Sequence, residues 1–226
     1  MIRVVKASEM KKIEKRWIDE IGVSSLALME NAASHVKEII EDECVGLKRI
    51  HVFSGYGNNG GDGIAVARLL FVDGYDVSVS MIGNPLKISY ECMRQIEIAK
   101  KLGIRFMDFN KLETDNYDLF VDAIFGIGLT RDVGGAFSKV IELINSNGKK
   151  VVAVDVPSGI DSDNGTVRGI AVKADYTVTI GIPKAGLFFY PGKEYAGKVY
   201  LANIGLNDVW DSEDEKIYLV EEKDVS

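Results

Sequence analysis

Short apolar runs alternate with longer segments of helical periodicity through most of this chain, and that alternation restricts the fold more than any other feature. Strands are predicted at 49–53, 75–82, 104–107, 119–123 and 151–155, near 174–180 and near 197–203, with helices at 61–73, 89–102 and 136–147. Repeated strand–helix–strand units build a sheet of parallel strands with helices on both faces. The sequence therefore predicts an α/β fold: a three-layer αβα Rossmann-like sandwich with a mostly parallel central sheet.

Two helices are predicted ahead of the first strand. Residues 9–21 carry an apolar stripe at helical spacing, with Ser8 as the expected N-cap and Gly22 as the end. A second apolar helix opens at Ser24 or Ser25. A helical pair in this position is unusual for a dinucleotide-binding fold, so we expect it to cover the sheet or to lie near the functional site.

Length, charge and cysteine content narrow the class of protein. The 226 residues suit one α/β domain, which we assign to residues 1–210, with 211–226 as a C-terminal strand or linker. The net charge of −7 argues against nucleic-acid binding. We find no signal peptide and no run of about 18 apolar residues. Cys44 and Cys92 lack metal-ligand spacing; reduced thiols are favoured over a disulfide. We expect a cytoplasmic protein with no nucleic-acid or membrane partner.

A glycine-rich stretch, residues 55–63, follows the first predicted strand and contains five glycines. Glycine permits positive φ and close approach of a ligand to the backbone, and a helix N-terminus attracts anions. The stretch matches the dinucleotide fingerprint G-x-G-x-x-G, which alone is a weak signal. A conventional dinucleotide site would also have an acidic residue at the end of the second strand, where 80–84 has none. Asn58, Asn59 and Asp62 instead add side-chain oxygens within the stretch.

Several other enzyme classes lack their signatures in this sequence. The P-loop pattern G-x-x-x-x-G-K-[ST] is missing. The only two histidines are His35, in a predicted helix, and His51, in a predicted strand, and both are expected to be structural. A Ser-His-Asp triad or a zinc site is therefore disfavoured.

Three predicted strand ends combine glycines with acidic or amide side chains. They are residues 57–63, 122–131 and 155–161. The carboxyl ends of parallel strands meet at one edge of a sheet, and ligands bind there. We therefore expect the three segments to form a single site.

These segments resemble the N-terminal YjeF family, the NAD(P)HX epimerases. The resemblance rests on residues 57–63, 122–128 and 154–159 and extends to about residue 206. It implies a Rossmann-like, commonly dimeric protein whose substrate is hydrated NADH or NADPH, with a hydroxyl on C6 of the reduced nicotinamide ring. The implied reaction interconverts the R and S epimers at C6, so that an ADP- or ATP-dependent dehydratase specific for S can repair both. The preference between NADHX and NADPHX stays open.

The resemblance also assigns site residues. It implies a potassium ion held by Asn59, Asp122 and Ser158. The amide, carboxylate and hydroxyl of these residues supply the oxygen ligands that a hard cation takes. The implied substrate-binding residues are Asn58, Asn59, Gly60, Gly61, Asp62, Gly126, Ile127, Gly128, Leu129, Thr130, Arg131, Asp132 and Asp155.

Epimerisation at C6 needs a group that moves a proton on or off the hydroxyl. This carbon is a hemiaminal, bonded to both the hydroxyl and ring nitrogen N1. Either loss of water through an iminium or ring opening to an aldehyde would scramble the centre. Asp155, at a predicted strand end beside a Pro-Ser-Gly turn, is the first candidate for this acid–base, and Asp62 and Lys184 are the second candidates.

Alternatives from other classes stay open. One is a non-catalytic scaffold with the same Rossmann-like fold, and another is a different dinucleotide-binding enzyme. The joint presence of Asn59, Asp122, Asp155 and Ser158 favours the epimerase over the scaffold. Residues 216–225 are similar to the segment that leads into a fused dehydratase, so the chain is either the epimerase half of a bifunctional protein or a free epimerase. We expect a homodimer.

Overall fold

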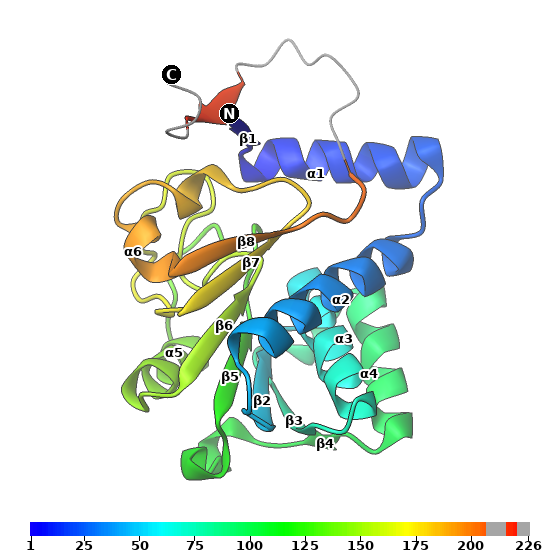
Figure 1. Ribbon diagram of the computed structural model, residues 1–226, viewed down its shortest axis with the longest axis vertical. Coiled ribbons are helices and arrows are strands. Elements are labelled where there is room, and N and C mark those ends of the chain that lie inside the picture. The colour runs from blue at the N-terminus through cyan, green and yellow to red at the C-terminus, as the bar shows by residue number, and fades with distance from the viewer. Residues whose placement is uncertain (207–215, 221–226) are drawn as a thin grey trace.

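The computed structural model describes residues 1–206 and 216–220. Its centre is a seven-stranded sheet with the order β4-β3-β2-β5-β6-β7-β8, in which every pairing is parallel (Figure 1). The strands are β2 (Arg49–Ser54), β3 (Asp76–Met81), β4 (Arg105–Phe106), β5 (Leu119–Ala123), β6 (Lys150–Val154), β7 (Tyr176–Ile180) and β8 (Lys198–Ala202). The predicted α/β fold is confirmed, and the strand order reverses between β2 and β5, where open α/β sheets bind ligands.

Helices cover both faces of this sheet and form the outer layers of the sandwich (Figure 1). The helices are α1 (Ala7–Arg16), a π-helical turn (Trp17–Ile21), α2 (Ser25–Glu43), α3 (Asn58–Val72), α4 (Tyr90–Leu102), α5 (Ala136–Ser146) and α6 (Gly192–Ala196), with short 3₁₀ turns at Pro85–Lys87, Phe109–Lys111, Thr114–Asn116 and Ala185–Leu187. Apolar residues of α2, α3 and α4 pack on one face of the sheet, and those of α5 pack on the other. Because β5 is covered on both faces, all five of its residues are buried.

Several predicted boundaries differ from the observed ones. Helix α3 begins at Asn58, three residues before the predicted start at 61, so Asn58 and Asn59 form its first turn. Helix α1 begins at Ala7 with Lys6 as N-cap, so Ser8 lies inside the helix and does not cap it. Gly22 ends the π-helical turn with φ of 89°, as a left-handed C-cap does.

Two short strands lie outside the main sheet. Strand β1 (Ile2–Val4) pairs antiparallel with β9 (Ile217–Leu219), which falls within the predicted C-terminal strand or linker. Figure 1 shows this pair beside the start of α1. The predicted domain boundary between residues 210 and 211 lies outside the described residues.

The N-terminal segment also hydrogen-bonds to the loop after β7. The backbone N–H of Val5 donates to the Pro183 carbonyl (2.9 Å), and Ala185 N–H donates to the Val5 carbonyl (3.0 Å). These two bonds flank Lys184. They fix the start of α1 relative to the carboxyl end of β7, so the N-terminal helices do reach the expected edge of the sheet.

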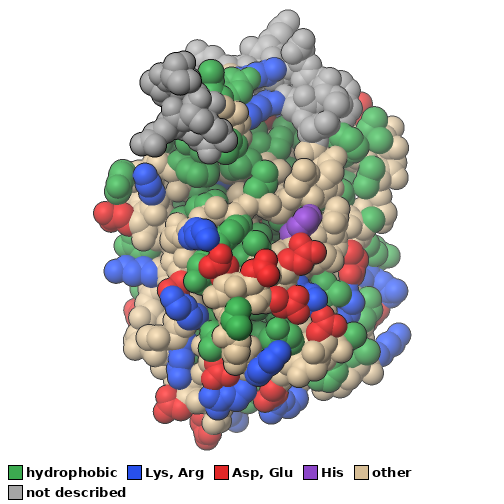
Figure 2. Space-filling model, viewed as in Figure 1, with side chains coloured by type: hydrophobic (Ala, Val, Ile, Leu, Met, Phe, Trp, Pro, Cys, Tyr) green, Lys and Arg blue, Asp and Glu red, His purple; other side chains and the backbone are tan. Residues whose placement is uncertain are grey.

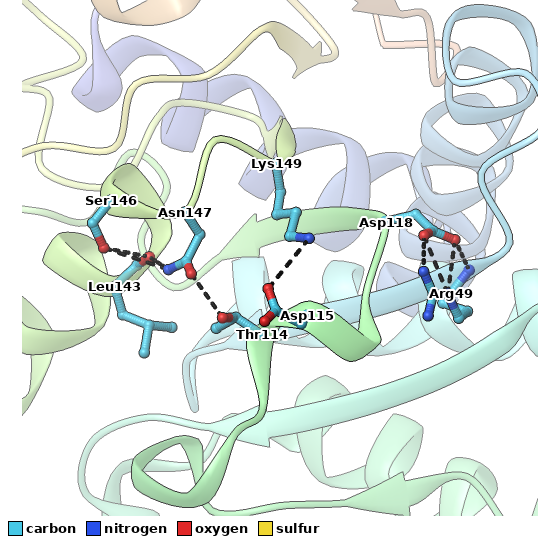
Figure 3. Close-up of polar contacts among 8 residues, drawn as sticks. All are labelled: Arg49, Thr114, Asp115, Asp118, Leu143, Ser146, Asn147 and Lys149. Carbon is cyan, nitrogen blue, oxygen red and sulfur yellow. Dashed lines mark hydrogen bonds and ion pairs between the residues drawn. The ribbon is translucent and has the colours of Figure 1, made fainter.

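Polar contacts join segments at the amino ends of the parallel strands (Figure 3). Asp118, just before β5, accepts hydrogen bonds from the backbone N–H (3.0 Å) and the Nε (3.1 Å) of Arg49 at the start of β2. Hydrogen bonding to the Arg49 guanidinium lowers the pKa of Asp118 to about 2. In the same region, the Thr114 hydroxyl donates to the Asn147 side chain (2.7 Å). Structural contacts thus occupy the amino ends of the strands and leave the carboxyl ends for a site.

The surface carries charges of both signs. Figure 2 shows acidic side chains gathered near the middle of one face, around a histidine, with basic side chains scattered among and below them. The described residues on this face form no continuous basic surface. No helix in the described part of the chain is long and apolar enough to cross a membrane. Both cysteines, Cys44 and Cys92, are buried free thiols.

Candidate functional site

A cavity of about 700 Å³ opens at the carboxyl ends of the parallel strands. Its walls come from α1, from the first turn of α3, and from the segments that follow β3, β5, β6 and β7. The predicted segments 57–63, 122–131 and 155–161 therefore converge, as expected from a parallel sheet. The cavity is large enough to hold a good part of a dinucleotide.

The predicted site residues fall into three groups. Those that line the cavity are Asn58, Asn59, Asp62, Gly126, Ile127, Gly128, Leu129, Arg131 and Asp155. Those that are buried and do not line it are Gly60, Gly61, Asp122 and Ser158. Those that are exposed outside the lining are Thr130 and Asp132.

The glycines of the 55–63 stretch have a packing role that differs from the expected one. None of them adopts positive φ. A Cβ atom on Gly60 would lie 1.9 Å from the Gly55 carbonyl oxygen, and one on Gly63 would lie 2.3 Å from the Ala123 Cβ. These glycines let α3 approach β2 and β5 closely. This close approach places Asn58 and Asn59, in the first turn of α3, in the wall of the cavity.

Asp155 and Lys184 form an ion pair in the cavity wall. Asp155 follows β6, is 7% exposed, and has φ of 69°, a region that costs a residue with a side chain about 1 kcal/mol. Its Oδ1 lies 2.5 Å from Lys184 Nζ and also accepts a hydrogen bond from Ile180 N–H (3.2 Å). Lys184 is 1% exposed, and its ammonium also donates to the Ile180 carbonyl. The strained backbone of Asp155 is the kind of feature that concentrates at functional sites.

Asp122 and Ser158 bind each other behind the cavity. The Asp122 carboxylate accepts from the Ser158 hydroxyl (2.6 Å), from Ser158 N–H (2.8 Å) and from Ile124 N–H (3.2 Å). The Ser158 hydroxyl accepts from Phe125 N–H (2.9 Å). Burial raises the pKa of Asp122 to about 6, against the opposing effect of these hydrogen bonds. This cluster joins the loop after β5 to the loop after β6.

Asn59 lies close to that junction and has an unusual environment. Its Oδ1 and Nδ2 are buried and have no hydrogen-bond partner. A Cβ atom on Gly126 would lie 3.0 Å from both Asn59 Oδ1 and Asp155 Oδ2, so the bare backbone of Gly126 passes beside both oxygens. An unpaired buried amide costs about 1–3 kcal/mol unless a ligand or ion satisfies it. Together with Asp122 and Ser158, its oxygen fits the hard donor set expected for potassium.

Helix α1 contributes residues that the sequence did not assign to the site. Met10, Lys11 and Glu14 line the cavity. The pKa of Glu14 is raised, mainly by burial and then by the charge of Asp155. Asp62, on α3, has its pKa raised well above the usual range by burial, with smaller contributions from Asp155 and Glu14. The position of a helical pair before the first strand was the only sequence signal for this role.

Exposed cations and aromatic rings complete the lining. Lys11, Lys87 and Arg131 are exposed residues of the cavity wall, where they can interact with phosphate oxygens. The rings of Phe125 and Phe137 also line it, with centroids 4.7 Å apart. Neither histidine lines the cavity.

Comparisons with known proteins identify relatives that match most of this chain. The chain is 40% identical to the NAD(P)H-hydrate epimerase of Oenococcus oeni, over 89% of this chain and 96% of that protein. It is 45% identical to the NAD(P)H-hydrate epimerase of Limosilactobacillus reuteri, over 89% and 95%. It is 39% identical to the bifunctional NAD(P)H-hydrate repair enzyme Nnr of Thermofilum pendens, over 90% of this chain and 40% of that protein.

A solved structure and a family match complete the comparison. The crystal structure of the yeast protein ynu0 superposes with a TM-score of 0.77 at 21% identity, covering 96% of this chain and 100% of that one, so it shares the fold. The family described as YjeF-related protein N-terminus matches residues 25–186, a span that includes the Asn59, Asp122, Asp155, Ser158 and Lys184 positions. The chain belongs to the YjeF-related N-terminal family.

Proposed function

We propose that this protein is an NAD(P)H-hydrate epimerase, which interconverts the R and S forms of hydrated NADH or NADPH at C6 of the nicotinamide ring. Relatives that match it over nearly their whole length carry this activity in their names. The observation that carries the proposal at the level of chemistry is the buried Asp155–Lys184 pair in the wall of a cavity that can hold a good part of a dinucleotide.

Asp155 is the residue that we assign to proton transfer. In the water-loss route, the C6 hydroxyl takes up a proton, the C6–O bond breaks, and the N1 lone pair forms an N1=C6 iminium as water leaves. Water then adds to the other face of C6, N1 recovers its lone pair, and a base removes the extra proton. In the ring-opening route, a base takes the hydroxyl proton as the N1–C6 bond breaks and N1 is protonated, which leaves C6 as an aldehyde. N1 then closes on the other face of C6, loses its proton, and the oxygen is protonated again. Either route needs a base at C6, and the Asp155 carboxylate, held in place by Lys184, can supply it.

Other predicted residues that line the cavity would bind the substrate. The 126–128 backbone and the exposed Arg131 line the cavity and are suited to the pyrophosphate. Asn58 and Asp62, on α3, are suited to the polar groups of the nicotinamide ribose half.

A potassium ion would be held by Asn59, Asp122 and Ser158. The unpaired buried amide of Asn59 supports this assignment, since a cation would satisfy its oxygen. When bound, the ion would supply a fixed positive charge beside the site. The chain's own contribution is to position that amide next to Gly126 and Asp155.

The partners and the cellular setting are also proposals. A dehydratase specific for the S epimer would consume the product, and the relative from Thermofilum pendens, named as bifunctional, supports a fused partner in some proteins. A homodimer and a cytoplasmic location remain expectations from the family resemblance and the sequence. The non-catalytic scaffold is the second candidate, and retention of both the ion pair and the cavity weighs against it.

A coupled assay tests the proposed function. A mixture of R and S hydrates of NADH is incubated with an S-specific dehydratase and its nucleotide, with and without this protein. We expect the R epimer to disappear only when the protein is present, and to persist with the variant Asp155→Asn. Persistence of the R epimer with the wild-type protein would reject the epimerase and leave the scaffold.

A further inference from the structure

Helix α1 is held over the cavity by contacts at its start. The backbone bonds of Val5 flank Lys184, and the N–H of Ala7 donates to the Asp163 carboxylate (2.5 Å). Met10 is buried beside Gly181, since a Cβ on that glycine would lie 2.8 Å from Met10 Cε. Glu14 is one helical turn further on the same face, because residues i and i+4 of a helix lie one above the other. The fold therefore aims the Glu14 carboxyl into the cavity, and both Met10 and Glu14 line it.

The surroundings of Glu14 are acidic. The charged groups that act on it are Asp155, Glu91, Lys184 and Lys11. Those that act on Asp62 are Asp155, Glu14, Lys184 and Glu91. Lys184 is already bound to Asp155, and Lys11 is exposed. Among residues 1–206 and 216–220, no ion pair or hydrogen bond joins the side chain of Glu14 or Asp62 to another protein group.

We propose that Glu14 is a catalytic residue of the epimerase, acting as the proton donor while Asp155 acts as the base. This inference rests on the proposed function. A carboxyl group that is half-buried, lacks a cation of its own and faces the ion-paired Asp155 and the carboxylate of Glu91 holds its proton to higher pH than an exposed one. Acid–base pairs arise where two titratable groups have environments that favour opposite protonation states.

The two roles account for every proton in either route. In the water-loss route, Glu14 gives its proton to the C6 hydroxyl, the C6–O bond breaks and the iminium forms. Water adds to the other face, Asp155 takes the released proton, and proton exchange between the two carboxyl groups through the substrate or solvent resets the site. In the ring-opening route, Asp155 takes the hydroxyl proton and Glu14 protonates N1 as the N1–C6 bond breaks and C6 becomes an aldehyde. N1 then attacks the other face of C6, Glu14 takes back the N1 proton and Asp155 returns a proton to the oxygen. No oxidant or reductant is needed, because R and S differ only in configuration.

The variant Glu14→Gln tests the proposal, since glutamine keeps the shape of the side chain and cannot transfer the proton. We expect kcat for R-to-S conversion to fall at least about 100-fold with KM changed less than about threefold. We also expect the alkaline fall of the wild-type rate, caused by loss of the Glu14 proton, to be missing from the variant. Glu20→Gln, the same substitution at an exposed position after α1, is the matched control and should behave as wild type.

The outcomes separate the two claims. Wild-type protein that fails to interconvert the epimers would reject the proposed function. Active wild type together with a Glu14→Gln variant that keeps its rate, or that loses rate but keeps the alkaline limb, would reject Glu14 as the donor. If Glu14→Gln fails to fold, wild-type protein labelled with ¹³C-glutamate decides the matter, with the Glu14 signal identified by its loss in Glu14→Asp. A Glu14 carboxyl that titrates above the ordinary range supports the proposal, and one that titrates within it overturns it.

Discussion

The ammonium of Lys184 lies 2.5 Å from the Asp155 carboxylate, and the two side chains come from loops that follow neighbouring strands, β6 and β7. Both side chains are almost completely buried. A buried ion pair is costly to break, since removing one partner leaves the other charged and unpaired. The pair therefore links the stability of the protein to the geometry of its reactive centre.

Mutation can separate the effect of this ion pair on stability from its effect on activity. Asp155→Asn should lower kcat at least about 100-fold and should also reduce the free energy of unfolding by about 3 kcal/mol, because Lys184 loses its carboxylate. The double variant Asp155→Asn with Lys184→Met should recover most of the stability and none of the activity. Urea unfolding and the coupled assay measure the two effects. A double variant as unstable as Asp155→Asn alone would show that the ion pair is not the source of the loss.

The glycines of α3 provide a second prediction. Gly60→Ala should destabilise the protein by about 3 kcal/mol, because its Cβ would overlap the Gly55 carbonyl oxygen at 1.9 Å. Gly57→Ala is the control, since a Cβ there meets nothing within 4 Å, and it should cost about 1 kcal/mol or less as a helix N-cap change. Thermal unfolding compares the two variants. Equal losses would mean that close packing of α3 on the sheet is not what these positions require.

His51 predicts a pH dependence of stability. Its ring nitrogens lie 2.7 Å from the Ser78 hydroxyl and 2.9 Å from the Ser80 hydroxyl, and burial lowers its pKa to about 3. The unfolded chain, with a histidine pKa near 6.5, binds a proton first as pH falls. The stabilisation is therefore fully present well above pH 6.5 and is lost as pH falls toward 3, by about 2 kcal/mol between pH 6.5 and 4.5.

Comparison with a variant isolates this effect from other titrating groups. His51→Gln should show a free energy of unfolding that changes less than that of wild type over this pH range. Parallel curves for wild type and His51→Gln would contradict the assignment.

Asn59 gives a test of the proposed potassium ion. At a potassium concentration ten times the dissociation constant, the melting temperature should rise by roughly 4 °C relative to choline chloride of equal ionic strength. Asn59→Ala should abolish the rise, because the amide oxygen is removed. Differential scanning calorimetry with sodium as a second control measures this. A rise that persists in Asn59→Ala would place the ion elsewhere.

Much of the fold followed from the sequence because it depends on local patterns. The seven strands of the main sheet and helices α2 to α5 were predicted within a few residues, since apolar period and end signals mark them. The convergence of Asn59, Asp122 and Asp155 followed from the parallel topology alone. These inferences need only the order of elements along the chain.

Other features depend on contacts that no local pattern encodes. The role of Glu14 requires α1 to cross the cavity, and that placement depends on Val5 meeting the segment around Lys184. The sequence marks the glycines of 55–63 as special, and we expected them to adopt positive φ. The structure shows that glycine is needed there because α3 packs close to the sheet, and none of these glycines has positive φ. In the cavity lining, positive φ is found instead at Gly83 and at Asp155.

The bonds between Val5 and the residues flanking Lys184 also affect the order in which the protein can assemble. These partners are separated by most of the chain, so their contact carries a large loop-closure cost and forms late. During synthesis from the N-terminus, α1 emerges first but has no docking surface until β7 and its following loop have been made. The parallel sheet can therefore form before the reactive centre does, and the nascent protein gains its acid–base groups only when its first residues return to its last third.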